Sequence, residues 1–309
     1  MSNIGNGAAW RKSMQMDLLT SGEAADYLRI KERKLYELVA ERQIPCTKAT
    51  GKWLFPRAEL DRWLLAGLAR PAGIAPANPP LIIGGSHDPL LEWALRESNS
   101  EIASLAEGSA VGYRKLLSGK VIAAAIHFHA ADDPGVDGNV ALVSREPSLY
   151  DAVLIAFAVR EQGLLLAEGN PLNLASIAAA VVGGARFAVR PEGAGAQQLL
   201  HALLQREGLD PSRLVRAPGI CPTGPDIAQA IRGRHADCGV ASRSVAVTHG
   251  LEFLPLKLER FDLLMRQRDY FRAPMQALLG LLRQARFAAR ARELGGLDVR
   301  DAGVIRWTP

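Results

Sequence analysis

The sequence predicts a small helical domain followed by a larger α/β domain built from two lobes. Residues 18–64 combine a helix-capping motif with apolar residues at helical spacing. A segment rich in Pro, Gly and Ala follows at residues 70–80, and is typical of a linker. From residue 81 onward, short apolar strands alternate with loops and helices, which favours a parallel sheet. Two different folds therefore lie on either side of the linker.

The composition indicates the class of protein and shows in which part of the chain the basic residues are concentrated. The chain has 309 residues, enough for two or three domains, and its apolar content of 48% can supply a substantial core. Residues 1–70 contain 12 Lys and Arg against 8 Asp and Glu, whereas the remainder contains 25 against 24. The basic excess belongs to the first quarter. Three cysteines without a Cys-x-x-Cys pair argue against a disulfide framework and against a zinc site, so we expect reduced thiols.

The N-terminal residues 1–16 lack the apolar core of a secretory signal, and we expect a flexible tail there. No stretch of the sequence has the uninterrupted apolar length that a membrane-spanning helix needs. We therefore expect a cytoplasmic protein that does not contact a membrane.

The first domain is predicted at residues 17–69. Thr20 and Glu23 form a capping-box pattern at the start of a helix whose inner face is apolar. A tight turn at 29–30 leads to a second helix, and a third is expected from residue 57 to about residue 65. The predicted core positions of the three helices are Ala24, Ala25, Leu28, Leu35, Leu38, Val39, Leu60, Trp63 and Leu64.

Cationic side chains follow the second helix and the segment after it. Between residues 31 and 57 there are seven Lys and Arg against three Glu. A turn at 49–52 predicts a hairpin wing. A cationic face is often only solvated, but its coincidence with a helix-turn-helix and a wing favours double-stranded DNA as the partner. The candidate DNA-binding residues are Lys31, Arg33, Lys34, Tyr36, Lys48, Lys52 and Arg57.

Three short motifs in this segment match a known family: "TSGEAADYL", "KLYELVAERQIP" and "KATGKWLF". Together they resemble the excisionase-type branch of the winged helix-turn-helix proteins related to the MerR family. The resemblance covers about fifty residues and implies DNA binding. Lys31 stands where this family often has Ser or Thr before the recognition helix.

The second domain, residues 81–309, begins with a strand at 81–84, a loop, and a helix at 90–96. Further strands are expected at 101–106, 121–128, 186–189, 236–241 and 251–256, and helices at 109–118, 174–182, 197–207, 226–232 and 273–291. The apolar segment 153–167 is interrupted by Arg-Glu-Gln-Gly, which predicts a pair of strand pieces crossing between lobes. We expect lobe I to contain about residues 81–160 and 251–309, and lobe II about residues 161–250.

Segments such as "GSHDPLLEWA", "RFAVRPEGAGAQQLLHALL" and "DIAQAIRGRHADCGVASRSVA", in this order, resemble the type II periplasmic-binding-protein fold, and most closely its cytosolic molybdate-binding-like branch. The resemblance implies a two-lobed clamshell that binds a small ligand. The family's Gly-Ser-Gly turn is Gly-Ala-Gly here, without a hydroxyl, and Ala196 follows where Thr is frequent.

A cleft between two such lobes places helix N-termini around a ligand, and their free amides favour an anion. Backbone amides and the Ser86 and Ser109 hydroxyls would suit a tetrahedral oxyanion, with Arg160 or Arg190 as a fixed positive charge. Glycine-rich loops at strand ends also have a purely geometric explanation. The candidate ligand-binding residues are Ser86, His87, Asp88, Gly108, Ser109, His127, Arg160, Arg190, Gly193, Ala194, Gly195 and Ala196.

Metal binding and catalysis are not expected. We expect the side chains of His127 and His129 to face opposite sides of a predicted strand and therefore not to share an ion. Ser86 beside His87 is no evidence for hydrolysis, because a nucleophile needs a base and an orienting group in space. There is no nucleophile elbow, P-loop or zinc motif. We expect no enzyme and no cofactor.

These observations favour a ligand-responsive transcriptional regulator that binds operator DNA as a dimer or tetramer. The favoured effector is molybdate or tungstate. A sensor of molybdenum cofactor or another small organic anion remains open, as do an enzyme of cofactor biosynthesis and an architectural DNA-binding factor.

Overall fold

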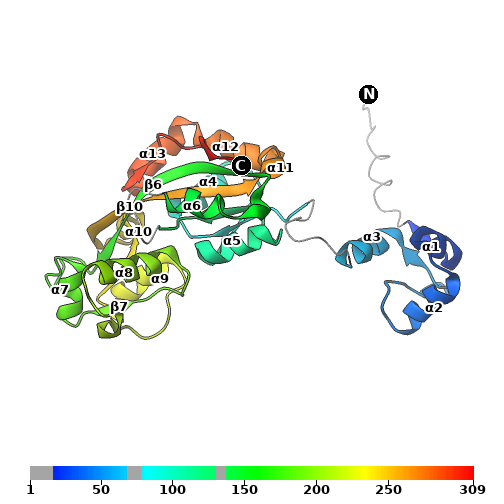
Figure 1. Cartoon of the computed structure of the whole chain (residues 1–309), viewed down its shortest axis with the longest axis horizontal. Helices are drawn as coiled ribbons and strands as arrows, with labels where there is room; N and C mark the ends of the chain where they lie inside the picture. Colours follow the sequence, from blue (N-terminus) through cyan, green and yellow to red (C-terminus); the bar gives the residue numbers. More distant parts are fainter. Residues whose placement is uncertain (1–16, 68–77, 130–136) are drawn as a thin grey trace, which may run out of the picture. The chain divides into compact units, whose positions relative to one another are not determined.

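The computed structural model describes residues 17–67, 78–129 and 137–309. The chain divides into two compact units, Met1–Pro71 and Ala72–Pro309. The tail expected at residues 1–16 and most of the linker expected at 70–80 lie outside the described residues. Figure 1 shows the elements of each unit, which are described separately below.

The first unit contains three helices and a small two-stranded sheet. Its elements are β1 (Leu18–Leu19), α1 (Ser21–Leu28), α2 (Glu32–Ala40), β2 (Phe55–Pro56) and α3 (Arg57–Ala66), with β1 antiparallel to β2. The capping box forms as predicted: Glu23 accepts from the Thr20 amide at 2.8 Å, and the Thr20 hydroxyl accepts from the Glu23 amide at 3.4 Å.

The core of the first unit joins residues from all three helices and from the segment between α2 and α3. Its buried members are Ala24, Ala25, Leu35, Val39, Ile44, Phe55 and Leu60. Leu64, which we expected in this core, is 44% exposed. The prediction for Leu64 was wrong because α3 buries Leu60 and partly buries Trp63, so that Leu64 falls beside the buried face.

The second unit is an α/β structure around one mixed sheet. Its strands are β3 (Ile82–Gly85), β4 (Ala103–Ala106), β5 (Ala123–Ile126), β6 (Ala152–Leu166), β7 (Arg186–Ala188), β8 (Val215–Arg216), β9 (Cys238–Ser242), β10 (Glu252–Arg266), β11 (Leu297–Asp298) and β12 (Ile305–Trp307). Its α-helices are α4 (Pro89–Glu97), α5 (Ser109–Leu117), α6 (Gly138–Val143), α7 (Ile177–Val182), α8 (Gly195–Arg206), α9 (Gly224–Arg232), α10 (Arg243–His249), α11 (Gln267–Tyr270), α12 (Ala273–Leu282) and α13 (Ala285–Leu294), with short 3-10 turns at Pro147–Leu149 and Pro211–Arg213.

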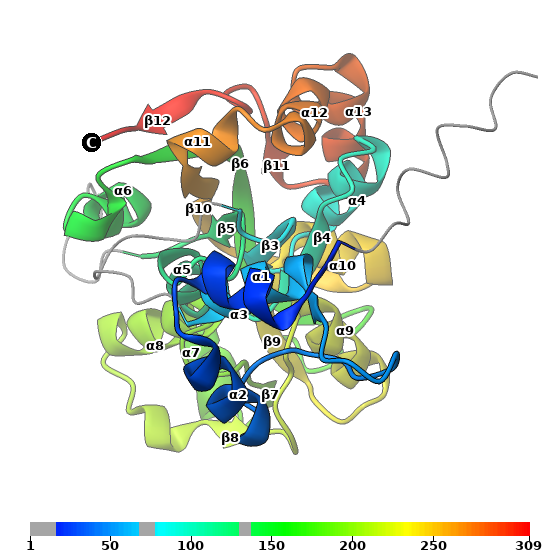
Figure 2. The same cartoon turned by 90° about the vertical axis from the view of Figure 1, so that its right-hand side faces the viewer.

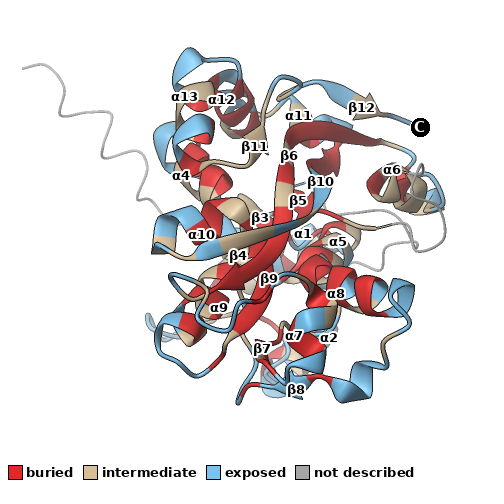
Figure 3. Ribbon diagram, turned by 90° about the vertical axis from the view of Figure 1, so that its left-hand side faces the viewer, coloured by how far each residue is buried: buried red, intermediate tan, exposed pale blue. Residues whose placement is uncertain are grey.

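The strand order is β4-β3-β5-β10-β6-β9-β7-β8, with β11 and β12 pairing β6. In lobe I, β3 is parallel to β4 and β5, and in lobe II, β7 is parallel to β8 and β9. Strands β6 and β10 belong to both lobes. They pair antiparallel along their whole length, from Glu252 opposite Leu166 to Arg266 opposite Ala152, and Figure 3 shows them passing from one lobe to the other.

The two long strands correct two predictions. β6 is continuous, where we expected two pieces, and β10 extends ten residues beyond the predicted end at residue 256. Charged residues inside these strands obscured the strand pattern. Arg160 and Glu259 pair with each other within the sheet, and this internal pairing lets them remain buried. β11 and β12 were not predicted, since such short strands depend on pairing with β6.

Helices cover the sheet of each lobe. In lobe I, α4, α12 and α13 lie side by side and bury a core that includes Phe157, Phe261 and Phe287 (Figure 2). In lobe II, α7 and α8 bury one face of the sheet, and α9 with α10 contributes a further apolar cluster. Among the described residues, no helix combines the length and the apolar character needed to cross a membrane.

Candidate functional site

A small polar pocket lies between the two lobes. Its volume is about 20 Å³, enough for a group the size of a water molecule in this conformation. Several lining residues lie at, or within a few residues after, the carboxyl ends of strands β3, β5, β7 and β9, where α/β sheets bind ligands. The lining residues are Ser86, His87, His127, Arg160, Gln162, Arg190, Gly195, Ala196, Gly224, Ala241, Ser242 and Val245.

Several helices begin beside this pocket without a side-chain cap, and two of them approach each other closely. They are α5, whose N-cap is Gly108, and α8, whose N-cap is Ala194. The two caps lie close together, since a Cβ on Gly108 would be 3.5 Å from the Ala194 Cα. Uncapped first-turn amides and the helix dipole together favour an anion.

Gly195 permits a close approach at the start of α8. A Cβ at this position would lie 2.2 Å from Cε1 of His127 and 2.7 Å from the His127 carbonyl oxygen. Any larger residue would therefore separate α8 from the end of β5. Gly195, the second glycine of the Gly-Ala-Gly turn, is therefore needed for packing between the lobes, whichever ligand binds.

Arg190 is the cation of the pocket that lacks a partner. Its Nε is buried without a hydrogen bond, and no carboxylate in the described part of the chain forms an ion pair with its guanidinium. Burial lowers the pKa of Arg190 to about 10, although Asp226 and Cys221 act in the opposite direction. The side chain remains charged at neutral pH, so the pocket contains a positive charge that the protein does not neutralise.

Arg160 differs from Arg190 because its charge is already neutralised. Its Nε donates to Glu259 at 2.5 Å and its Nη1 donates to Asp88 at 3.0 Å. Burial alone would lower the pKa of Arg160, but the two carboxylates outweigh it and raise the pKa. Asp88 also caps α4, accepting from the amides of Leu90 and Leu91. Arg160 and Asp88 therefore hold the site together.

The two serines proposed as ligands have different positions. Ser86 lines the pocket, whereas Ser109 is fully buried behind it. The two hydroxyls are 2.9 Å apart, and the Ser109 hydroxyl accepts from the His127 amide at 3.0 Å. Ser109 thus fixes the backbone at the end of β5, and Ser86 remains near the pocket.

The expectation that His127 and His129 face opposite sides was wrong. Only neighbouring residues of a strand face opposite sides, so residues two apart such as His127 and His129 share a face, and β5 in any case ends at Ile126. His127 Nδ1 is 3.0 Å and His129 Nε2 is 3.2 Å from the same oxygen of Glu259. Burial lowers the pKa of His127 to about 4, so its imidazole is neutral at physiological pH. Burial also lowers the pKa of His87.

Burial alone would raise the pKa of Glu259, but His127 and Arg160 hold it well below its usual range. Its Oε1 accepts from Arg160 and also from Gln162 Nε2 at 2.8 Å. Glu259 is therefore an ionised carboxylate at the centre of a buried polar cluster.

Seven predicted ligand residues line the pocket: Ser86, His87, His127, Arg160, Arg190, Gly195 and Ala196. The other five, Asp88, Gly108, Ser109, Gly193 and Ala194, lie outside its lining. The sequence did not indicate Gln162, Gly224, Ala241, Ser242 or Val245, nor Glu259 behind them. The one available signal was the transition from β9 to α10 at Ser242, another strand end followed by a helix.

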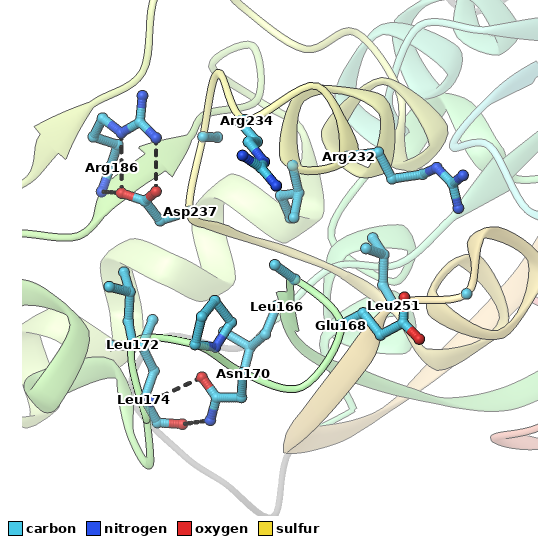
Figure 4. A pocket seen from close by; sticks show the side chains of 15 residues that line it. Leu166, Glu168, Asn170, Leu172, Leu174, Arg186, Arg232, Arg234, Asp237 and Leu251 are labelled. Carbon is cyan, nitrogen blue, oxygen red and sulfur yellow. Dashed lines mark hydrogen bonds and ion pairs between the residues drawn. The ribbon is translucent and has the colours of Figure 1, made fainter.

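A larger cavity of about 630 Å³ lies in lobe II (Figure 4). It adjoins Arg186 and Asp237, at the amino ends of β7 and β9, opposite the edge where α/β sheets bind ligands. Its arginines already have partners in two cases: Arg186 pairs with Asp237 at 2.7 Å, and Arg232 donates to the His249 carbonyl at 2.6 Å. We therefore place the candidate ligand site in the smaller pocket.

All seven candidate DNA-binding residues are exposed on the first unit. Arg33 and Lys34 each lie 3.3 Å from Glu37, in exposed pairs that contribute little stability and can exchange for phosphate. Arg57 stacks 4.9 Å above Tyr27, and Lys48 lies 5.3 Å above Trp53. The wing forms around a bridge between Thr47 and Leu54.

Comparison with known proteins gives matches to both units. A family model described as a PBP superfamily domain matches residues 92–283, and a helix-turn-helix domain model matches residues 18–67. The uncharacterized protein YvgK of Bacillus subtilis strain 168 is 20% identical over 301 residues, covering 93% of this chain and 96% of that protein. An uncharacterized protein in the 5′ region of the ferredoxin 2Fe-2S gene of Clostridium pasteurianum is 23% identical over 108 residues, covering 35% and 96%.

Among solved structures, an H2O2-bound cysteine-to-serine mutant of Corynebacterium glutamicum OxyR aligns with a TM-score of 0.49 at 15% identity, covering 89% of both chains. The tungstate ABC transporter from Geobacter sulfurreducens aligns with a TM-score of 0.45 at 16% identity, covering 70% of this chain and 97% of that one. The two matching domain models are of DNA-binding and substrate-binding types, and they support a DNA-binding regulator with a ligand-binding domain. The chain belongs to the PBP superfamily domain family, with a helix-turn-helix domain at its N-terminal side.

Proposed function

We propose that this protein is a transcriptional regulator whose second unit binds a small inorganic oxyanion, with molybdate or tungstate as the favoured ligand. In this proposal residues 17–69 bind operator DNA, residues 81–309 bind the effector, and the protein acts in the cytoplasm as a dimer or tetramer. The observation that supports it most directly is Arg190 in the pocket between the lobes: its Nε is buried without a hydrogen bond, and no described carboxylate forms an ion pair with it.

An anion resolves the electrostatic imbalance of this pocket. A buried cation without a partner costs free energy, and an anion that accepts from it recovers this cost through a charge-assisted hydrogen bond. The uncapped N-termini of α5 and α8 supply amide donors beside the same pocket. Arg160 does not compete for the anion because Glu259 and Asp88 already neutralise it.

The size of the pocket favours a compact inorganic ion over an organic ligand. With a volume of about 20 Å³, a tetrahedral oxyanion requires a small separation of the lobes, whereas molybdenum cofactor would require a large one. Strands β6 and β10 cross between the lobes, so bending of this pair would open and close the pocket.

Regulation follows if the ligand prefers one lobe arrangement, because only a difference in affinity between two states shifts their populations. A single recognition helix contacts few base pairs, so two copies on a two-part operator would supply the affinity that one copy lacks.

Thermal unfolding of the purified protein with molybdate, tungstate, sulfate, phosphate and a molybdopterin-like compound tests the ligand. A ligand at about 100 times its Kd stabilises the folded state by about 2.7 kcal/mol. We expect a shift with molybdate or tungstate. If no oxyanion shifts the transition and an organic anion does, the oxyanion assignment is wrong.

DNA binding is tested separately, by selecting sites from a random double-stranded pool and footprinting them with and without the effector. We expect a two-part site whose occupancy depends on the effector. Binding that is indifferent to every stabilising ligand would indicate an architectural factor. Turnover of a bound compound would indicate an enzyme.

A further inference from the structure

We propose that His127, His129 and Glu259 form a binding site for a divalent transition-metal ion, with zinc as the best match. The inference goes beyond the proposed function and does not depend on which anion binds. It rests on the convergence of two imidazoles on a carboxylate that is 132 residues from His127 in the sequence. All three side chains are almost fully buried, with 5%, 7% and 2% of their surface exposed, respectively.

The donor atoms have the spacing of a metal site. His127 Nδ1 and His129 Nε2 lie 3.0 and 3.2 Å from the same Glu259 oxygen, and the three donor atoms are all within 4.8 Å of one another. Ligand atoms around a tetrahedral zinc ion are about 3.3 Å apart, given metal–ligand bonds of about 2.0–2.1 Å. Two histidines and one glutamate are also a donor set that zinc uses in proteins, with a fourth position left open.

His129 supplies an independent observation. Its Nε2 is buried and, among the described residues, lies near only the Glu259 carboxylate, at 3.2 Å, without forming a well-directed hydrogen bond. A buried polar atom without a partner is uncommon and requires an explanation. A metal ion between Nε2 and the carboxylate would provide the missing partner.

The surroundings of Glu259 match those of a metal ligand. Its Oε1 accepts from Arg160 at 2.5 Å and from Gln162 at 2.8 Å, and this leaves Oε2 to the two histidines. Such outer contacts orient a ligating carboxylate. Arg160 also pairs with Asp88, so the two carboxylates and one guanidinium have a net charge of −1. This excess negative charge favours a cation, and Arg190, which lines the same pocket, is a positive charge beside which a bound metal ion would lie.

The test uses the full chain, treated with EDTA and dialysed. Zn²⁺ is titrated in competition with a chromophoric chelator, and Co²⁺ is followed by its visible absorption. We expect one equivalent of Zn²⁺ and the intense bands of four-coordinate Co²⁺ in the wild type. Loss of a residue that only contacts a metal ligand lowers metal affinity by roughly 10- to 100-fold. His129→Gln should lower the affinity for Zn²⁺ by more than this. Gln162→Ala should lower the affinity for Zn²⁺ by roughly 10- to 100-fold, because Gln162 contacts the ligand Glu259 and not the metal.

Two further variants make the result decisive. His235→Gln, which changes an exposed histidine of lobe II, is the matched control and should bind Zn²⁺ as the wild type does. His129→Cys replaces one ligand with another, so it should keep the metal and add a sulfur-to-cobalt charge-transfer band. The inference is overturned if the wild type binds no stoichiometric Zn²⁺. It is also overturned if His129→Gln binds Zn²⁺ as tightly as His235→Gln.

The anion-dependent shift in unfolding temperature, measured in EDTA, separates this inference from the proposed function. Stabilisation by an oxyanion without any Zn²⁺ binding would refute only the inference of a metal site. Stoichiometric Zn²⁺ binding without stabilisation by any anion would refute only the proposed anionic ligand.

Discussion

Replacing Arg190 with Met should make the protein more stable without ligand and almost unresponsive to anions. The Nε of Arg190 is buried without a hydrogen bond to any described residue, and burial lowers the pKa of the side chain from its ordinary value to about 10. Each pKa unit corresponds to about 1.36 kcal/mol, so the charged side chain costs the folded state up to about 3 kcal/mol. Since the folded-state pKa is the lower one, this cost is present at every pH below about 10 and fades as pH rises from there towards the ordinary pKa of arginine.

Arg190→Met keeps much of the side-chain volume and removes the charge. For a unit of this size, 1 kcal/mol shifts the unfolding temperature by about 2–4 °C, so a rise of several degrees is expected without ligand. Loss of a hydrogen bond from a charged donor costs about 1.5–3 kcal/mol, which weakens the binding of the anion by about 10- to 150-fold. At a concentration of about 100 times the wild-type Kd, a 30-fold loss reduces the stabilisation from about 2.7 to about 0.9 kcal/mol.

Differential scanning calorimetry with and without the anion measures both effects. Arg234→Met, at the larger cavity of the same lobe, is the matched control and should keep the full anion-dependent shift. Undiminished stabilisation of Arg190→Met by the anion would refute the assignment of Arg190 as the ligand's partner. A lower unfolding temperature of the unliganded variant would show that the buried charge is compensated.

Three further predictions concern the DNA-binding face, the first unit and the sheet. Arg33→Ala should weaken operator binding by about 1–3 kcal/mol in a mobility-shift assay and leave the stabilisation by the anion intact. Arg62→Ala on α3 is the control and should not weaken operator binding. Equal losses of operator binding in both variants would contradict this. Leu35→Ala opens a cavity in the first unit and should cost about 2–5 kcal/mol there, so only one calorimetric transition should move. Burial raises the pKa of Asp262 to about 6, so the contribution of this carboxyl group to stability should fall by up to about 3 kcal/mol as pH rises from 4 to 6, seen as the difference between wild type and Asp262→Asn. Urea titrations should show that Asp262→Asn loses this slope, and an unchanged slope would disprove the assignment.

The local parts of the fold could be predicted because they depend on residues near one another in sequence. The capping box at Thr20 and Glu23 forms with both of its hydrogen bonds, since the two side chains are three residues apart on one helical turn. The short strands of lobe I and the helices that follow them were found in the same way. The ends of β5 were less certain, because pairing with neighbouring strands decides where a strand stops.

The candidate site could be predicted only in part. Gly195 and Ala196 were identified because a glycine turn before a helix is a local signal for anion binding. Glu259 was missed because it lies inside β10, where a charged residue appeared to rule out a buried strand. His129 was assigned to the wrong face because the strand alternation was misapplied: residues two apart in a strand share a face, and only neighbours alternate.

Residue patterns alone were enough to indicate the two domain types and the positive charge of the first unit, and they predicted seven of the residues that line the candidate pocket. They could not indicate which arginine is free to bind the ligand. Arg160 and Arg190 were equivalent candidates in the sequence, but in the folded chain Glu259 and Asp88 neutralise Arg160, and no carboxylate of the described residues pairs with Arg190. The effect of a buried charge depends on what lies within a few ångströms, and the neighbours of Arg160 come from strands and loops about 70 to 100 residues away.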